Sequence, residues 1–256
     1  MKNTILTLII LLYFTASCQR PDQKDYSFTL EEYRELGFPE LNISWDNREY
    51  EILFEHLSKM KYQQPMSLPR KNSRKSGPLF DRLSGEENLA FLNDDVVPLQ
   101  VKVTNIRVYG DFVNDLINIY YDFFRSTQYY HTELVYLYTL KIRVGEEMMN
   151  LAGKILSSEK QEDLALVHDL WSIRHIYLNM LYQVMEKQEL RSLYPKKEYQ
   201  ILCDSVGAAV KRNMEWFDPV IAKQIGDQLQ RVVDSVDIPA VRKEYQELID
   251  GLHISQ

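Results

Sequence analysis

Residues Glu159–Gln188 have the sequence EKQEDLALVHDLWSIRHIYLNMLYQVMEKQ, in which apolar residues recur every three or four positions. Such spacing is typical of an α-helix. On a helix that turns 100° per residue, these side chains cover more than half of the circumference. The side chains on this surface include those of Leu164, Leu166, Val167, Leu170, Trp171, Ile173, Tyr177, Leu178, Leu181, Tyr182, Val184 and Met185. We therefore expect a central helix that is packed against neighbours on two sides.

The sequence that follows predicts three more helices with short connections. Pro195 begins the first, which extends to Phe217. The pair Asp218–Pro219 ends that helix and caps the next one, and Asp237-Ile238-Pro239 repeats the same arrangement before the last helix. Because the connections are short, consecutive helices should lie close together and antiparallel.

The sequence that precedes it predicts long helices as well. One runs from Tyr129 to Leu156, and another follows Pro98 and continues to Phe124. The valine-rich segment Val96–Val103 also permits a short strand, although the later spacing favours a helix. The sequence thus predicts an all-α protein of seven to nine helices, with an antiparallel helical bundle in residues 96–256.

A smaller helical N-terminal part is predicted in residues 29–95. Thr29 and Glu32 form a capping box before a short helix, a second helix extends from Ser44 to Lys61, and Ser84 with Glu87 predicts another N-cap. Between them, residues 62–78 form a proline-containing loop without apolar periodicity. It carries four basic residues, Arg70, Lys71, Arg74 and Lys75. Two interpretations remain open, a solvated loop or a contact with anionic lipid or an acidic partner.

The composition limits the classes of function. The chain has 37 acidic and 30 basic residues and a formal charge of −7, which argues against nucleic acid as a partner because phosphate binding needs clustered positive charge. With 45% apolar residues, nine glycines and nine prolines, the sequence is typical of a globular protein.

The N-terminus has the features of an export signal. Lys2 precedes an apolar run from Ile5 to Phe14, which is too short to span a bilayer. The run ends in Thr15-Ala16-Ser17-Cys18, which resembles the lipobox of bacterial lipoproteins, although Thr15 replaces the usual leucine. The resemblance implies that residues 1–17 are removed as a signal peptide and that Cys18 carries a lipid. The alternative is an ordinary signal-peptidase cut with an incidental thiol at Cys18.

The segment after the cysteine, residues 18–28, is predicted to be a lipidated tether to the folded body. Gln19 is not an aspartate, and in such lipoproteins this implies export to the outer membrane of the cell envelope. Removal of residues 1–17 gives 29 basic and 37 acidic residues, and a charge of −8. Cys203, the second cysteine, has an apolar helical neighbourhood and is predicted to be a small buried residue.

The residues that could carry chemistry are few. His168 and His175 lie seven residues apart on a polar strip, which is too far for two metal ligands on one helix, since 1.5 Å per residue separates them by about 10 Å. They are interpreted as solvated side chains or as part of a polar groove for a ligand. No phosphate-binding loop, nucleophile elbow or paired-cysteine zinc motif occurs in the sequence. We therefore predict no metal, no cofactor and no catalytic residue, and leave enzymatic activity undecided with a preference against it.

Aromatic residues are frequent between Tyr120 and Tyr138. At helical spacing they are more often core residues, but Tyr129 and Tyr130 are candidates for an exposed contact surface, since tyrosine is frequent in protein interfaces. The predicted function is that of a membrane-anchored envelope lipoprotein that binds another envelope protein. The alternative is a helical small-ligand carrier or enzyme with a polar groove near His168 and His175.

Overall fold

The computed structural model describes residues 47–63, 68–74, 76–127, 129–158, 166–188 and 194–254. Within them the chain forms eight α-helices and two 3-10 helices and has no strand. These are α3 (Asn47–Gln63), α4 (Gly77–Leu83), η2 (Glu86–Leu92), α5 (Leu99–Thr127), α6 (His131–Leu156), α8 (Val167–Gln188), α9 (Lys196–Asn213), η4 (Met214–Trp216), α10 (Pro219–Ser235) and α11 (Pro239–Ile254). The predicted all-α fold is confirmed.

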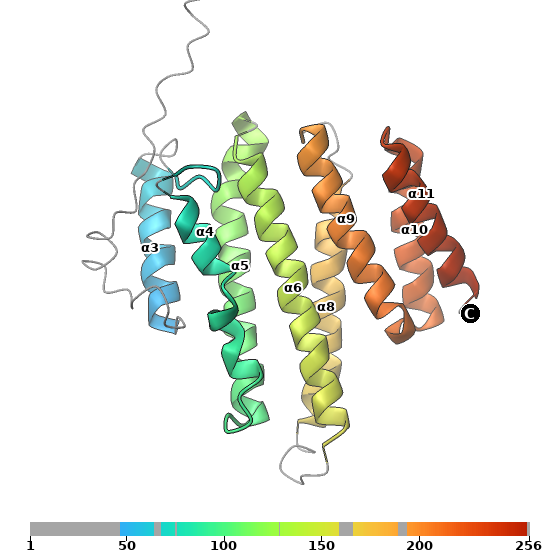
Figure 1. Cartoon of the computed structure of the whole chain (residues 1–256), viewed down its shortest axis with the longest axis horizontal. Coiled ribbons are helices and arrows are strands. Elements are labelled where there is room, and N and C mark those ends of the chain that lie inside the picture. Colours follow the sequence, from blue (N-terminus) through green and yellow to red (C-terminus); the bar gives the residue numbers. More distant parts are fainter. Residues whose placement is uncertain are drawn as a thin grey trace, which may run out of the picture.

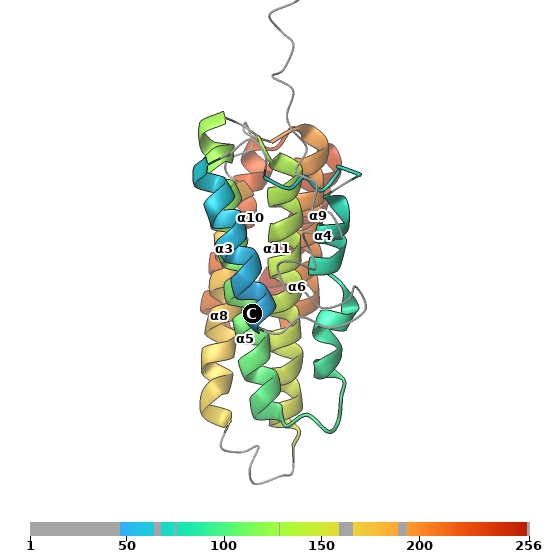
Figure 2. The ribbon, with the colours of Figure 1, turned by 90° about the vertical axis from the view of Figure 1, so that its left-hand side faces the viewer.

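The helices form two layers (Figures 1 and 2). One layer contains α3, α5, α8 and α10, and the other contains α4, α6, α9 and α11. From α5 to α11, each helix runs antiparallel to the one before it (Figure 1), as the short connections predicted. Neighbouring helices of one layer therefore run in the same direction. α6 and α9 are such a pair, and they lie side by side and parallel.

α8, the helix predicted to be central, is central in the structure. α8 packs against α6, α9 and α10, and its buried residues include Ile173, Tyr177 and Val184. Its first predicted residues, 159–165, lie outside the described part of the chain, and a turn at Leu166 precedes the helix.

The buried residues of both layers form one hydrophobic core, in which tyrosines are frequent. Tyr120 and Tyr245 are fully buried, and their hydroxyls donate to the carbonyl oxygens of Pro69 (3.0 Å) and Cys203 (2.9 Å). A buried hydroxyl without such a partner would cost free energy, so each tyrosine joins two segments that are distant in sequence. Cys203 itself is buried, as predicted.

Side chains of α5 and α6 bind the C-terminal ends of α4 and η2. The hydroxyl of Tyr109 donates to the carbonyl of Leu83, at the end of α4. The amines of Lys102 and Lys154 donate to the carbonyl of Leu92, at the end of η2, over 3.0 and 3.1 Å. The last carbonyls of a helix have no partner within the helix and carry partial negative charge, so cationic donors stabilise them.

Two local predictions are wrong, and one alternative that the sequence left open is excluded. α4 begins at Gly77, inside the predicted loop 62–78, where a Cβ would lie 2.7 Å from the Lys71 carbonyl oxygen and only glycine fits. Ser84 does not cap the following helix as predicted, since its hydroxyl donates to the carbonyl of Phe80 (3.3 Å) and the N-cap is Gly85. The valine-rich segment is helical from Leu99 onward, which excludes the strand alternative there.

Candidate functional site

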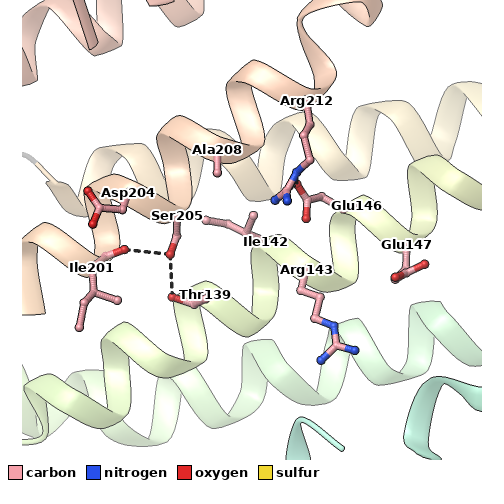
Figure 3. Close-up of a pocket in the computed structure, with 10 residues that line it drawn as sticks. All are labelled: Thr139, Ile142, Arg143, Glu146, Glu147, Ile201, Asp204, Ser205, Ala208 and Arg212. Atoms are coloured by element: carbon pink, nitrogen blue, oxygen red, sulfur yellow. Dashed lines mark hydrogen bonds and ion pairs between the residues drawn. The ribbon is translucent and has the colours of Figure 1, made fainter. Parts of the chain in front are cut away.

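A groove of about 590 Å³ follows the seam between α6 and α9, on the outer side of their layer (Figure 3). The ten residues that form it come from these two helices alone. They are Thr139, Ile142, Arg143, Glu146 and Glu147 from α6, and Ile201, Asp204, Ser205, Ala208 and Arg212 from α9. Because residues three and four positions apart share one face of a helix, each set is a single stripe.

Small side chains form the floor of the groove. The hydroxyl oxygens of Thr139 and Ser205 lie 3.2 Å apart across the seam, and each hydroxyl also lies within hydrogen-bonding distance of the carbonyl one turn before it, that of Val135 (2.9 Å) and that of Ile201 (2.8 Å). Ala208 lies in the next turn of α9. Since none of these side chains is long, the surface is hollow between the two backbones.

An ion pair crosses the middle of the groove. The Nε and NH2 groups of Arg212 lie 2.8 and 2.6 Å from the same carboxylate oxygen of Glu146. Burial raises the pKa of Glu146, which Arg212 opposes and the neighbouring Glu147 reinforces. Arg143 turns away toward the end of α4, where NH1 donates to the carbonyl of Ser84 over 3.1 Å.

The groove continues toward the end of α9. A second hollow of about 570 Å³ shares Glu146, Glu147 and Arg212 with the first, and extends to Gly153 and Trp216. Along α6 the two hollows extend from Thr139 to Gly153, which corresponds to about 21 Å at 1.5 Å per residue. The two hollows together are long enough for about four turns of a helix.

Three acidic residues of the groove have no cationic partner among the described residues. They are Glu147, Asp204 and Glu215. Glu147 accepts one hydrogen bond from the amide of Asn150 (3.3 Å). Burial raises the pKa of Asp204, whose charge also raises that of Glu244 on α11. The groove therefore has an excess of negative charge.

The sequence predicts no metal site, and the structure is informative on this point only for its described part. In that part, no three His, Cys, Asp or Glu side chains come together as a metal site would require. The side chain of His168 lies outside the described residues, and His175 is exposed on α8, in the layer opposite to α6 and α9.

Arg70 and Lys71, the first two basic residues of the predicted loop, contact other residues of the fold. The expectation of a solvated basic surface is therefore wrong at these two positions. The backbone N–H of Lys71 donates to the buried carboxylate of Glu133 on α6 over 2.8 Å, and the guanidinium of Arg70 lies 3.8 Å from the other oxygen. Burial raises the pKa of Glu133, although both of these groups lower it. Arg74 is exposed, and Lys75 lies outside the described residues.

Tyr130 is also inside the fold, so the expectation of an exposed contact surface is wrong for this residue. Its side chain is 0% exposed, and Arg70 stacks 4.0 Å from its ring centroid. Tyr129 is partly buried, with the same guanidinium 5.7 Å from its ring. Tyr130 has a φ of 66° at the N-cap of α6, and its ring lies 5.2 Å from that of Tyr120 on α5.

A buried amine on α6 was not anticipated from the sequence. Lys141 is 4% exposed, and its amine donates to the side-chain carbonyl of Gln183 on α8 over 2.6 Å. Burial, reinforced by the charge of Lys187, lowers the pKa of Lys141 to about 8. The signal was present in the sequence, since Lys141 follows Leu134, Leu137 and Leu140 and precedes Val144 on the apolar side of its helix.

No protein-family model, no curated protein and no solved structure matches the chain. In the described part, none of the helices has the length and apolar character needed to cross a bilayer. Function is therefore inferred from the sequence and from the groove.

Proposed function

We propose that this chain is a membrane-anchored lipoprotein of the cell envelope whose helical body binds another protein. The observation that carries the binding role is the open α6–α9 groove, with its ion pair and its three acidic residues without cationic partners. A small ligand is usually enclosed on most sides, whereas this hollow is long and open along one helix seam. Its shape favours a macromolecular partner.

The anchor part of the proposal rests on the sequence Thr15-Ala16-Ser17-Cys18 after an apolar run. A lipid on Cys18 would hold the body at the membrane surface, because each buried methylene contributes about 0.8 kcal/mol and two or more chains give stable anchoring. Residues 18–28 would then separate the helical body from the lipid.

The anchor is tested with Cys18→Ala in the full-length chain. We expect this variant to lose incorporation of labelled fatty acid and to leave the membrane fraction. The matched control is Cys203→Ala, because Cys203 is the other cysteine and is buried in the core. The control should label and fractionate like the unchanged protein. Undiminished labelling of Cys18→Ala would overturn the proposed anchor.

A further inference from the structure

We propose that the α6–α9 groove receives a basic amphipathic α-helix of another protein. This inference rests on the proposed binding function and names the kind of partner. It is carried by three independent properties of the groove, which are its length, its apolar contacts and its charge.

The dimensions suit one helix. A length of about 21 Å corresponds to about 14 helical residues. Packed helices have axes 8–10 Å apart, and small residues at the contact permit the closer approach. Thr139, Ser205 and Ala208 supply such a floor in the first hollow and Gly153 in the second, on either side of the Arg212–Glu146 ion pair. A Cβ at Gly153 would meet nothing within 4 Å, so the groove is open to a partner at its end near the C-terminus of α6.

Apolar contacts are available at both ends. Ile201 at one end is 43% exposed, and Trp216 at the other end is 37% exposed. Tryptophan is among the residues that contribute most to protein interfaces, since its large ring is removed from water on binding. Between these two side chains the rim is polar. A partner helix therefore needs an apolar stripe with its large side chains near its two ends.

The charge determines what flanks that stripe. Glu147, Asp204 and Glu215 have no cationic partner among the described residues, whereas Arg212 is neutralised by Glu146 and Arg143 is turned toward the end of α4. Lysine or arginine residues on the flanks of an incoming helix would compensate these carboxylates. Such complementarity increases the association rate and rejects acidic partners.

The same charges argue against occupants from this chain. A second copy would bring a formal charge of −7 and an acidic groove of its own. The N-terminal segment 29–36, which is predicted to be helical, has three glutamates and one arginine. In the most basic segment, the guanidinium of Arg70 lies 3.8 Å from Glu133 on another part of α6, and the amine of Lys71 lies 3.5 Å from Asp81 on α4. The partner is therefore a different protein.

Photocrosslinking in cells that naturally contain the protein tests this inference. A benzophenone amino acid replaces Ile201 or Trp216, one at a time, in the full-length chain. The matched control position is Val220 at the start of α10, which is 67% exposed and apolar but does not line the groove. We expect one adduct from both groove positions and not from the control. Mass spectrometry should map the adduct to a helical segment of another protein that carries lysine or arginine on its flanks.

Charge reversal provides the second measurement. Asp204→Lys with Glu215→Lys should reduce the yield of adduct by at least about tenfold, which corresponds to about 1.4 kcal/mol of lost affinity. The matched control, Glu55→Lys with Asp227→Lys, reverses two exposed charges elsewhere and should leave the yield within about twofold of the unchanged protein. Circular dichroism verifies that all variants fold.

The outcomes separate this inference from the proposed function. Adducts only from positions outside the groove would overturn the groove inference and leave the binding role intact. An adduct to an acidic or non-helical segment, or to a second copy of this chain, would also overturn the groove inference. So would a yield of adduct that charge reversal leaves unchanged. If no surface position of the anchored protein gave an adduct, both the groove inference and the proposed binding role would be overturned. Fatty-acid labelling in the same cells tests the anchor separately.

Discussion

Replacing Lys141 with methionine should stabilise the protein, although it removes a hydrogen bond. Lys141 is 4% exposed, and its amine reaches Gln183 at the edge of the α6–α8 contact. Methionine has a similar length, fills the same space and carries no charge. The only bond it loses is one to an exposed amide, which can turn to water.

The magnitude follows from the pKa of Lys141. The ordinary value for lysine is 10.5, and burial with the nearby Lys187 lowers it to about 8. This difference corresponds to about 3 kcal/mol by which the fold opposes the charged amine. Below pH 8 the amine is charged in both states, so the folded state bears the whole cost. We expect Lys141→Met to be about 2–3 kcal/mol more stable at pH 7.

The dependence on pH gives the decisive assay. Between the lowered pKa of about 8 and the ordinary 10.5, the unfolded state binds more protons, so the contribution of Lys141 to stability rises with pH. Urea unfolding at pH 7.0, 8.5 and 9.5 should show the variant's advantage shrinking as pH increases. Measurements end below pH 10, where unfolded tyrosines ionise while buried ones such as Tyr136, whose pKa is raised to about 12, do not.

The control for this assay is Lys223→Met, which removes an exposed amine on α10. It should change the free energy of unfolding by less than about 0.5 kcal/mol at each pH. A Lys141→Met variant that is less stable than the unchanged protein at pH 7, or whose advantage is the same at every pH, would refute the reasoning.

Substitutions at four further positions test the packing, a helix cap and a buried carboxylate. Gly145→Ala places a Cβ 2.7 Å from the ring of Tyr177 and should cost about 1–3 kcal/mol in urea unfolding, whereas Gly226→Ala, with nothing within 4 Å, should stabilise by about 0.5–1 kcal/mol. Asp218→Ala removes the side-chain N-cap of α10 and should lower the free energy of unfolding by about 1 kcal/mol. Glu133→Gln should remain within about 1 kcal/mol of the unchanged protein at pH 7, since the glutamine oxygen can still accept from the Lys71 N–H, while Glu133→Ala should cost about 2–4 kcal/mol by leaving a buried N–H and a guanidinium unpaired. Equal stability of the two Glu133 variants would contradict this account.

The helices were predictable because their signals are local. The pair Asp218–Pro219 marks a helix start through the backbone it constrains, and the structure shows Asp218 accepting from the N–H of Ile221 over 2.9 Å. α4 was missed because it has only seven residues and follows the irregular loop. Its position depends on distant contacts, such as the Tyr136 hydroxyl that donates to the carbonyl of Phe80.

The groove could not be predicted in the same way, because it belongs to two helices that are not consecutive. α6 and α9 are parallel neighbours only because α8 turns back between them in the opposite layer. Glu146 and Glu147 were visible in the sequence, but the partner of Glu146 is Arg212, 66 residues away. A pattern within one helix does not indicate which helix will lie beside it.

The basic loop shows a further limit, and it bears on how the protein would face a membrane. The four basic residues of the loop left open a contact with anionic lipid or an acidic partner, but the guanidinium of Arg70 lies 3.8 Å from the buried Glu133 and the amine of Lys71 lies 3.5 Å from Asp81. Without residues 1–17 the chain has 29 basic and 37 acidic residues and a net charge of −8, which an anionic bilayer repels. Surface charges interact over a Debye length of about 8 Å, whereas a tether as long as residues 18–28 can extend to roughly 35 Å. Under the proposed anchoring, repulsion would hold the helical body away from the bilayer, and the acidic groove would remain accessible to a basic helix from solution.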